Sequence, residues 1–274
     1  MEIVQEISRF ETICHTRTFN KTSNNNVLML HWHERYELCQ VVEKECSFRV
    51  DGKIVNASVG DIVAINEQLV HQFIIKEDDT KIRICQLPAK LLLNFGNSIK
   101  PLKIHITAEE ISRVDSLGDK LNALFDIMEQ EKKNGFVAND HFQQSLVTTL
   151  YFLLERHFPE VENAFSGERD RQEFYRIIDY INAHYAEDIN VEQIAKQLYF
   201  SRMRLTAVFK KYAGEGVNEY INKLRIKNAN YLLTKGATIT EAAFSSGFQS
   251  IRTFNNIYRK IMNMTPSEYI RENK

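Results

Sequence analysis

The first third of the chain alternates short apolar runs with turn residues. Seven runs of four to seven residues, rich in Val, Ile, Leu and Phe, predict a series of short β-strands. They occupy residues 27–30, 36–42, 47–50, 53–57, 62–65, 71–75 and 82–87. Asp51-Gly52 between two of these runs is a strong signal for a two-residue hairpin. Many short strands with regular turns are typical of a sandwich or small barrel, and we expect a β-barrel-like domain over about residues 1–105.

From Thr107 onward the apolar spacing changes to that of α-helices. Thr107 and Glu110 form the pattern of a capping box at the start of the first helix. A second amphipathic helix is expected over residues 139–158. Two such helices after a barrel either close that barrel or offer a face to a second subunit, and the pattern leaves both interpretations open.

A polar stretch separates these helices from the rest of the chain. Residues 159–170 contain Pro159, Ser166 and Gly167, which indicates a linker. Everything after it has helical spacing, with helix stops at four glycines, Gly214, Gly216, Gly236 and Gly247. The fold class predicted for the whole chain is α+β with two domains, of which the C-terminal one is all-α.

Two helix-turn-helix-like units are visible in the final hundred residues. They cover residues 191–205 and 239–254, and a helix over residues 217–235, about 27 Å long, joins them. In such a unit, two short helices with a tight connection place the second one where it can enter a DNA major groove, about 12 Å wide. The joining helix has a length that suits two major-groove segments about 34 Å apart on one face of the DNA.

The same hundred residues carry a series of fixed motifs. They are Tyr220-Ile221-Asn222-Lys223-Leu224-Arg225-Ile226, Gly247-Phe248-x-Ser250-x3-Phe254, Tyr258-Arg259-Lys260 and Met264-Thr265-Pro266-Ser267-Glu268-Tyr269. In this order they resemble the AraC/XylS family of bacterial transcription regulators over residues 171–274. Asn263 stands where the family usually has Gly before the Thr-Pro, and Ala242 replaces a bulkier aliphatic residue. Neither position is expected to face DNA in the family.

The resemblance implies promoter DNA and RNA polymerase as partners. The residues implied to contact DNA are Arg202, Met203, Thr206, Ala207, Lys210, Ile251, Arg252, Thr253, Asn255 and Asn256. The family often carries Arg at the position of Ala207, so a guanine contact is not expected there. Arg252 suits guanine edges, while Asn255 or Asn256 suits adenine. The alternative interpretation of any one of these residues is an ordinary solvent-exposed helix residue without a DNA contact.

A histidine-rich pattern lies in the predicted barrel. His31, His33 and Glu37 have the same parity, so their side chains share one face of an extended chain, and His71 stands in a later strand. This spacing resembles the metal-binding pattern of cupins, which implies a divalent ion held by His31, His33, Glu37 and His71. The alternative is a cupin-like sensor that keeps these polar residues without binding metal.

The same face is the predicted ligand pocket, because a barrel interior accommodates a small molecule. Its predicted residues are His31, Trp32, His33, Tyr36, Glu37 and His71. The rings of Trp32 and Tyr36 are of the kind that stack on sugars, although such a Trp often belongs to the core. With Leu87-Pro88, the His-Trp-His run resembles sugar-responsive family members such as the melibiose-operon regulator, which implies a sugar effector. Three positions depart from the cupin pattern, namely Lys44 for Gly, Asn66 for Pro and Gln68 for Gly.

The charge distribution adds to this interpretation. The whole chain has 35 Lys and Arg against 36 Asp and Glu, a net charge of -1. Residues 171–274 hold 16 basic and 10 acidic residues, a net charge of +6, whereas residues 1–170 hold 19 and 26, a net charge of -7. The C-terminal part is therefore suited to phosphate backbones, which the total charge conceals.

The chain start and the cysteines bear on the compartment. The first residues have neither a basic nor an apolar segment of a secretory signal, and the longest apolar runs are too short to span a bilayer. The four scattered cysteines, with no C-x-x-C pair, indicate reduced thiols and disfavour a disulfide framework. We expect a cytoplasmic protein with no membrane contact.

The combined hypothesis is a DNA-binding transcription activator without enzymatic activity. A cupin-like domain over residues 1–158 senses a small molecule, helices 108–158 form a homodimer, and residues 171–274 bind promoter DNA. One rival is a cupin metalloenzyme, such as a dioxygenase, with a helical tail; two helix-turn-helix units argue against it. The second rival is a ligand-independent regulator under the control of a protein partner.

Overall fold

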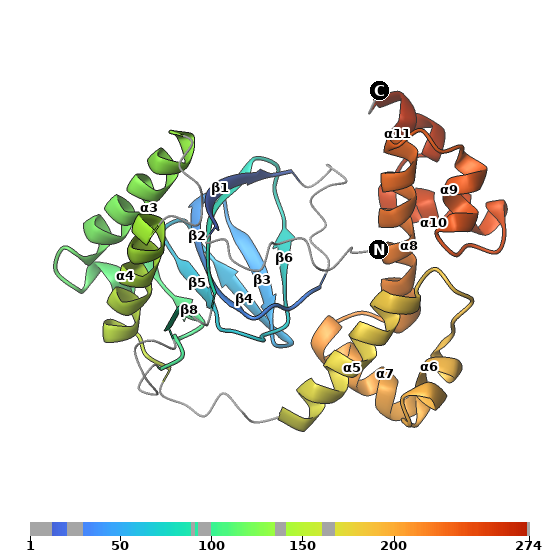
Figure 1. Ribbon diagram of the computed structural model, residues 1–274, viewed down its shortest axis with the longest axis horizontal. Coiled ribbons are helices and arrows are strands. Elements are labelled where there is room, and N and C mark those ends of the chain that lie inside the picture. Colours follow the sequence, from blue (N-terminus) through green and yellow to red (C-terminus); the bar gives the residue numbers. More distant parts are fainter. Residues whose placement is uncertain are drawn as a thin grey trace. The chain divides into compact units, whose positions relative to one another are not determined.

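The protein divides into two compact units, Met1–Ser166 and Gly167–Lys274. A computed structural model describes residues 13–20, 30–88, 91–92, 100–134, 141–160 and 168–272. The first unit contains the β-strands and the second is helical (Figure 1). The predicted two-domain α+β organisation is thereby confirmed.

The strands of the N-terminal unit form two antiparallel sheets. The strands are β1 (Ile13–Phe19), β2 (Arg35–Glu43), β3 (Cys46–Val50), β4 (Lys53–Ala57), β5 (Ile62–Ile65), β6 (His71–Ile75), β7 (Thr80–Pro88) and β8 (His105–Ile106). The larger sheet has the order β1-β7-β2-β5-β8 and the smaller has the order β4-β3-β6. Most of the strand predicted over residues 27–30 lies outside the described residues.

Left-handed backbone residues form the tight turns between these strands. Asp51 and Gly52 have φ angles of 48° and 81°, which is the geometry of the predicted hairpin turn between β3 and β4. Lys44 and Gln68, where the cupin pattern has Gly, also adopt positive φ angles of 63° and 60°. The turns thus keep the conformation that glycine favours, although these two residues have side chains.

The described strands do not close into the expected barrel. Closure requires hydrogen-bonded pairing all around the sheet, and within the described ranges the larger and smaller sheets have separate ladders. The two sheets instead pack face to face, with Cys39 and Ile84 of one sheet in the same core cluster as Phe48 and Phe73 of the other. Neighbouring residues on β2, such as Leu38, face a second core beneath the helices, so β2 is buried on both faces.

Three described helices follow the strands, namely α2 (Ala108–Ser112), α3 (Leu117–Lys133) and α4 (His141–His157). The helix predicted from Thr107 is interrupted over residues 113–116, and Ser116, just before α3, has a φ of 53°. The apolar spacing continues across this break and therefore does not reveal it. Phe125 of α3 and Leu150 of α4 are fully buried in the core that covers the larger sheet.

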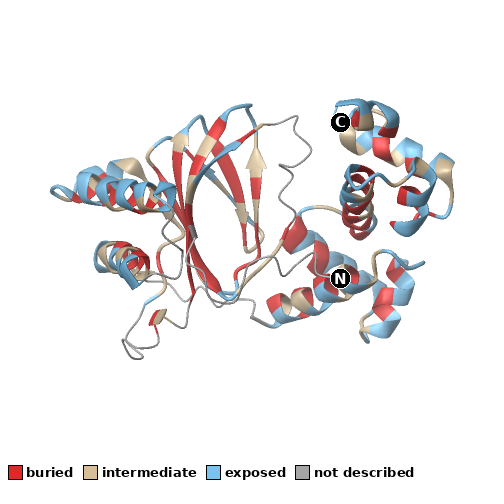
Figure 2. Ribbon diagram, turned by 45° about the horizontal axis from the view of Figure 1, so that its top comes forward, coloured by how far each residue is buried: buried red, intermediate tan, exposed pale blue. Residues whose placement is uncertain are grey.

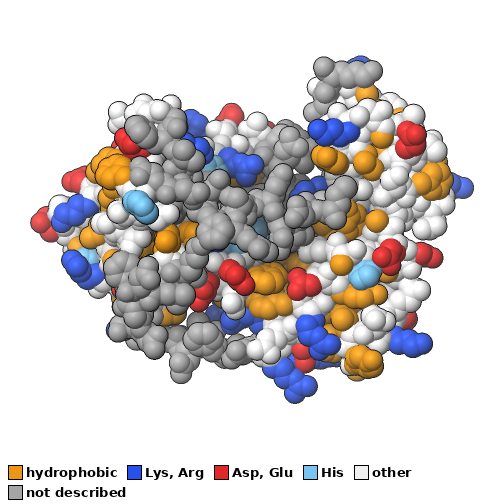
Figure 3. Space-filling view, in the orientation of Figure 1, with side chains coloured by type: hydrophobic (Ala, Val, Ile, Leu, Met, Phe, Trp, Pro, Cys, Tyr) orange, Lys and Arg blue, Asp and Glu red, His pale blue; other side chains and the backbone are white. Residues whose placement is uncertain are grey.

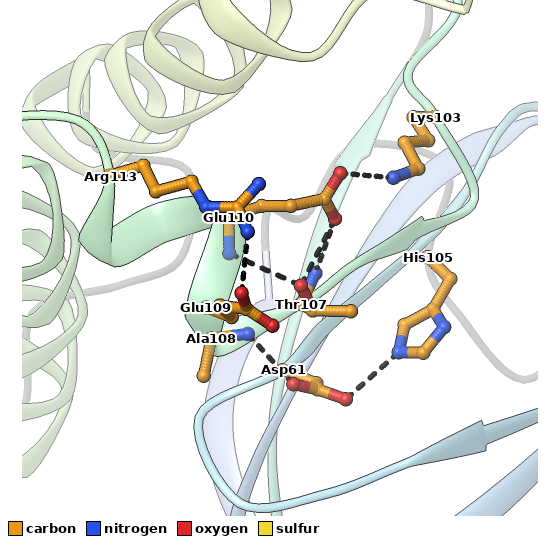
Figure 4. A network of polar contacts seen from close by, with 8 residues as sticks. All are labelled: Asp61, Lys103, His105, Thr107, Ala108, Glu109, Glu110 and Arg113. Carbon is orange, nitrogen blue, oxygen red and sulfur yellow. Dashed lines mark hydrogen bonds and ion pairs between the residues drawn. The ribbon is translucent and has the colours of Figure 1, made fainter.

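A buried carboxylate attaches α2 to the strands (Figure 4). Asp61 accepts hydrogen bonds from the backbone N–H of Ala108 at 2.8 Å and of Ser58 at 3.0 Å, and contacts His105 Nε2 at 2.8 Å. Burial alone raises the pKa of Asp61, but these hydrogen bonds outweigh it and hold the pKa below its ordinary value. The predicted capping box of Thr107 and Glu110 is also present beside it.

The C-terminal unit is built from seven described helices. They are α5 (Glu168–His184), α6 (Val191–Gln197), α7 (Arg202–Ala213), α8 (Val217–Thr234), α9 (Ile239–Ser245), α10 (Ile251–Met262) and α11 (Pro266–Glu272). The helix α5 includes the last three residues of the predicted linker, of which residues 161–167 lie outside the described residues. The helix α8 coincides with the joining helix that the sequence predicted over residues 217–235.

Two further expectations concern membranes and cysteines. Within the described parts of the chain, no helix combines the length and apolar character needed to cross a membrane. All four cysteines are free and buried. Burial raises the pKa of the Cys46 thiol to about 12, so this side chain stays protonated at neutral pH.

Candidate functional sites: two helix-turn-helix units and a histidine cluster

The first helix-turn-helix unit consists of α6 and α7. A capping box of Asn190 and Gln193, with both hydrogen bonds at 2.9 Å, fixes the start of α6. The Oγ of Ser201 accepts from the backbone N–H of Arg204 at 3.1 Å and so begins α7. On the inner face, Phe209 packs on Phe174 of α5 with ring centroids 5.5 Å apart.

The second unit, α9 and α10, repeats this construction. A capping box of Thr238 and Glu241 begins α9, and the Oγ of Ser250 accepts from the N–H of Thr253 at 3.1 Å to begin α10. Phe254 and Tyr258 of α10 are fully buried. The helix α10 ends at Asn263 with a φ of 55°. Asn tolerates this left-handed conformation better than most residues, which explains how it replaces the usual Gly.

A contact between the loop after α5 and the second helix-turn-helix unit lies at the turn before α10. Gly247 has a φ of 93°, and a Cβ atom there would lie 2.7 Å from the carbonyl oxygen of Ala186, in the loop after α5. Next to it, Arg225 of α8 donates to the carbonyl oxygens of Tyr185 at 2.7 Å and of Glu187 at 2.8 Å. Its guanidinium also lies 5.8 Å from the ring centroid of Phe248. The end of α5, which packs on α7 of the first unit, is therefore held against α8 and the second unit.

The outer faces of α7 and α10 carry the residues that the family resemblance assigns to DNA contact. Nine of the ten are exposed, and Ile251 alone is half-buried, against the core of the second helix-turn-helix unit. Figure 2 shows exposed residues along the helices of the C-terminal unit. Met203 is 80% exposed. Figure 3 shows Lys and Arg side chains over the C-terminal unit, mixed with carboxylates. The exposure agrees with a DNA-facing role but does not distinguish it from that of solvated residues.

Ion pairs between α5 and α7 are the feature that sequence reasoning missed. Arg204 contacts Asp170 at 2.5 Å and Glu173 at 2.7 Å, and Lys211 contacts Asp170 at 2.7 Å. Hydrogen bonds to these two carboxylates raise the pKa of Arg204. Asp170 belongs to the predicted linker, and no spacing in the sequence connects it with residues more than thirty positions away.

Three histidines of the N-terminal unit, His31, His33 and His71, come together at the edge of the smaller sheet. His31 pairs with His71 of β6 through two backbone hydrogen bonds of 2.9 and 3.0 Å. One potential ligand atom of each of His31, His33 and His71 lies within 4.8 Å of the other two. The sequence pattern predicted this grouping of the three histidines.

Glu37 joins this histidine cluster, which we define as His31, His33 and His71, through one of its members. Its carboxylate lies 3.2 Å from His33 Nε2 and accepts hydrogen bonds from Gln86 and from the Cys39 thiol. Burial alone raises the pKa of Glu37, but the hydrogen bonds with His33 and Gln86 and the electrostatic interactions with His71 and His33 together outweigh it, so the pKa is well below its ordinary value. Glu37 is therefore an ionised carboxylate inside the unit.

Hydrogen-bond acceptors fix which nitrogens of the cluster are available. His71 Nδ1 donates to the carbonyl oxygen of Leu69 at 2.8 Å, which leaves Nε2 with a lone pair. His71 Nε2 and His33 Nδ1 are buried and have no hydrogen-bond partner among the described residues. Burial lowers the pKa of His71 well below its ordinary value, so its imidazole is neutral at pH 7. A neutral imidazole with a fixed tautomer is the usual form of a histidine metal ligand.

The two aromatic residues predicted for the pocket occupy different places. Trp32 is half-buried between His31 and His33 along the chain. Tyr36 points to the opposite side of β2, because it is the neighbour of Glu37, and its ring packs on Tyr151 of α4 at 4.9 Å. The structure thus assembles the histidines and Glu37 but places Tyr36 in the core beneath the helices.

The N-terminal unit and the C-terminal unit each match a known domain family. Residues 17–146 match the AraC-like ligand binding domain and residues 194–272 match a helix-turn-helix domain. The HTH-type transcriptional regulator YdeC of Bacillus subtilis is 24% identical over 292 residues, covering 98% of this chain and 97% of that protein. An HTH-type transcriptional regulator of Staphylococcus aureus strain COL is 21% identical over 230 residues, covering 84% of this chain. The chain spans only 30% of the length of that relative.

Solved structures include relatives of the whole chain and of the C-terminal unit. ToxT from Vibrio cholerae covers 95% of this chain and 97% of its own, at 15% identity and a TM-score of 0.48. The C-terminal domain of AraT from Geobacillus stearothermophilus covers 36% of this chain and 84% of its own, at 26% identity and a TM-score of 0.36. With the two domain matches in this order, the chain is similar to transcriptional regulators of the AraC type and combines a match to an AraC-like ligand-binding domain with a match to a helix-turn-helix domain.

Proposed function

We propose that this protein binds promoter DNA through α7 and α10 and activates transcription in response to a small molecule bound by its N-terminal unit. The observation that carries the proposal is the repeated construction of the two helix-turn-helix units. Each presents an exposed helix that begins at a serine cap and whose opposite face is buried. A protein with this function works in the cytoplasm, where the promoter is.

The side chains of α10 give the base contacts that we propose. In this proposal Arg252, which is exposed, makes a bidentate contact to guanine, and the exposed Asn255 or Asn256 contacts adenine. The 18 residues of α8 span about 27 Å, which suits two adjacent turns of major groove. Exposed cations at the later turns of both helices, such as Lys210 and Arg259, suit phosphate groups.

Selection from a random duplex library with the full chain tests this proposal. We expect one preferred site, and a loss of affinity of about 5- to 150-fold at that site for Arg252→Ala, corresponding to about 1–3 kcal/mol. Lys120→Ala is the matched control, because it removes one exposed positive charge from α3 in the N-terminal unit. If no sequence is preferred, or if both variants lose affinity equally, the proposed function is wrong.

For the effector site we propose the histidine cluster with Trp32 and Glu37. Its nitrogen donors fit a divalent transition-metal ion, and the family resemblance favours a sugar. A calorimetric titration of the full chain with Zn²⁺, Ni²⁺ and Mn²⁺, and with a panel of sugars, distinguishes the two. His71→Ala is expected to abolish binding of whichever ligand is found, whereas His141→Ala on α4 leaves it unchanged. Binding that survives His71→Ala would move the effector site elsewhere.

For α3 and α4 we propose a homodimer contact. Ile127 and Phe142 are large apolar side chains on these helices, 40% and 48% exposed. Sedimentation of the full chain is expected to show a dimer that Ile127→Asp converts to a monomer. A monomeric wild-type protein would contradict this contact.

Activation implies a contact with RNA polymerase and is tested with a reporter driven by the selected site. Effector-dependent transcription that rises above the level without the protein supports activation, and a fall indicates repression. A transcription level that does not change with any ligand, but changes when a partner protein binds, favours the ligand-independent regulator. Turnover of a substrate by the metal-loaded protein, without specific DNA binding, favours the cupin metalloenzyme.

A further inference from the structure

The two DNA-facing helices are built alike and can be compared position by position. Both α7 and α10 have 12 residues, begin at a serine cap and end at a residue in the left-handed conformation. Counting from the serine caps, Met203 of α7 corresponds to Arg252 of α10. In the same count, Thr206 corresponds to Asn255 and Ala207 to Asn256. Equivalent places on the two helices therefore carry very different chemistry.

On α7 these three places present apolar groups. Met203 is 80% exposed, and Ala207 is exposed with only a methyl group to offer. The hydroxyl of Thr206 donates to the carbonyl oxygens of Arg202 and Met203, both at 3.0 Å, so its hydrogen is used within the helix. What remains for a partner on this face is a thioether and two methyl groups.

The arginines of α7 are engaged with carboxylates of their own domain. Arg204 is held by Asp170 and Glu173 of α5 at 2.5 and 2.7 Å. Arg202 contacts Glu192 of α6 at 2.9 Å, in an exposed pair that contributes at most about 1 kcal/mol. Arg202 can therefore still reach a phosphate. Arg204, which has two carboxylate partners, is not available for a bidentate guanine contact.

Tyr199 extends the apolar face at the start of α7. It stands in the turn before the helix, is 92% exposed and has a φ of 60°. The same turn of the second unit has Gly247, with a φ of 93°. A bulky side chain in this conformation is strained, and such strain is concentrated at functional positions. The residues near the start of a recognition helix are those that approach base edges.

We propose that α7 reads its half of the operator through thymine methyl groups, contacted by Met203, Thr206 and Ala207, whereas α10 reads purine edges. This inference rests on the proposed DNA binding. The C5-methyl of thymine is the apolar group that the major groove offers, and uracil presents the same hydrogen-bonding groups without it. Burial of one methyl group contributes about 0.8 kcal/mol, which corresponds to about fourfold in affinity.

Thymine-to-uracil replacement in the selected duplex tests the inference with the full chain. We expect two or three adjacent positions in one half-site at which a single replacement weakens binding about fourfold. In the other half-site, uracil has little effect, and 7-deazaguanine, which lacks the N7 acceptor, weakens binding. Arg252→Ala is expected to remove the 7-deazaguanine effect and to leave the uracil effect unchanged.

Met203→Ala supplies the decisive comparison, since this exposed side chain can be shortened without disturbing the core. At one of the sensitive positions, replacement of thymine by uracil is expected to no longer weaken binding by this variant. At the remaining sensitive positions, the replacement is expected to weaken binding as it does for the wild type. Ala207→Arg is expected to convert a preferred thymine into guanine when the selection is repeated.

Three results would overturn the inference: uracil tolerated throughout, a Met203→Ala variant as sensitive to uracil as the wild type, or a uracil effect that disappears in Arg252→Ala. Failure to select any site instead defeats the proposed function itself.

Discussion

Gly247→Ala probes the close contact between the second helix-turn-helix unit and the loop after α5. The new Cβ would lie 2.7, 2.8 and 2.9 Å from the O, Cα and C atoms of Ala186, all of them backbone atoms. Forcing this contact apart costs about 1–3 kcal/mol. The φ of 93° adds about 1–2 kcal/mol for an L-residue. We expect the C-terminal unit to lose about 2–5 kcal/mol, a large part of the stability of a typical domain.

Gly236→Ala is the matched control for this variant. Gly236 has a φ of 88°, but no atom lies within 4 Å of its added Cβ. It therefore has the backbone strain without the steric contact, and the gain from restricting the unfolded chain is common to both variants. The difference between the two free energies of unfolding isolates the contact with Ala186, about 1–3 kcal/mol.

Urea unfolding of the full chain, followed by two spectroscopic signals, measures the two variants. Circular dichroism at 222 nm follows the helices, and the fluorescence of Trp32, the single tryptophan, reports only the N-terminal unit. We expect Gly247→Ala to lower the unfolding midpoint of the helical signal more than Gly236→Ala, with the Trp32 transition unchanged. Equal midpoints for the two variants would refute the contact with Ala186.

Three further predictions concern named side chains. Arg225→Met removes two hydrogen bonds from a charged group to the carbonyl oxygens of Tyr185 and Glu187, so the free energy of unfolding of the C-terminal unit should fall by about 2–4 kcal/mol; a change within the error of the urea midpoint would contradict this. Burial lowers the pKa of His15 from 6.5 to about 4, and the charges of Lys132 and Arg17 act in the same direction. The unfolded chain therefore binds the extra proton, and the stability that this group gives is complete above pH 6.5 and decreases as the pH falls toward 4. His15→Gln should flatten the pH dependence of the Trp32 transition in that window, and an unchanged slope would assign the dependence to other groups. Tyr199→Gly relieves a strained conformation and should raise the stability of the C-terminal unit by up to about 1 kcal/mol while weakening DNA binding; unchanged affinity would remove Tyr199 from the interface.

The parts of the fold that depend on local chemistry could be predicted from the sequence. Asp51-Gly52 determines its own turn, and the caps at Ser201 and Ser250 determine where the two DNA-facing helices begin. Other elements depend on distant residues. The strand β1 alternates polar and apolar residues only weakly and is formed by pairing with β7, about seventy positions away. The sequence pattern likewise could not show that the described sheets remain separate.

The candidate sites divide in the same way. Parity on an extended chain placed His31, His33 and Glu37 on one face, and the resemblance to the cupin pattern added His71. The position of Glu37 as a partner of His33 depends on Gln86, which β7 brings beside it. The apolar character of the α7 face was visible residue by residue. The inference that this face makes apolar contacts also depends on the two carboxylates of α5 that pair with Arg204. No local sequence pattern connects these carboxylates with α7.

In the proposed DNA complex, the contacts of Arg225 and Gly247 with the loop after α5 also bear on which operators the protein can occupy. They join the end of α5, which packs on α7, to α8 and to the turn before α10, so the two groups of bases are expected to keep one separation along the duplex. B-DNA completes a turn in about 10–10.5 base pairs, so a single inserted base pair rotates one group by about 35° relative to the other. Degenerate base composition within each group is therefore compatible with binding, whereas a change in spacing is not. Genomic searches for its targets should hold the spacing constant and let the bases vary.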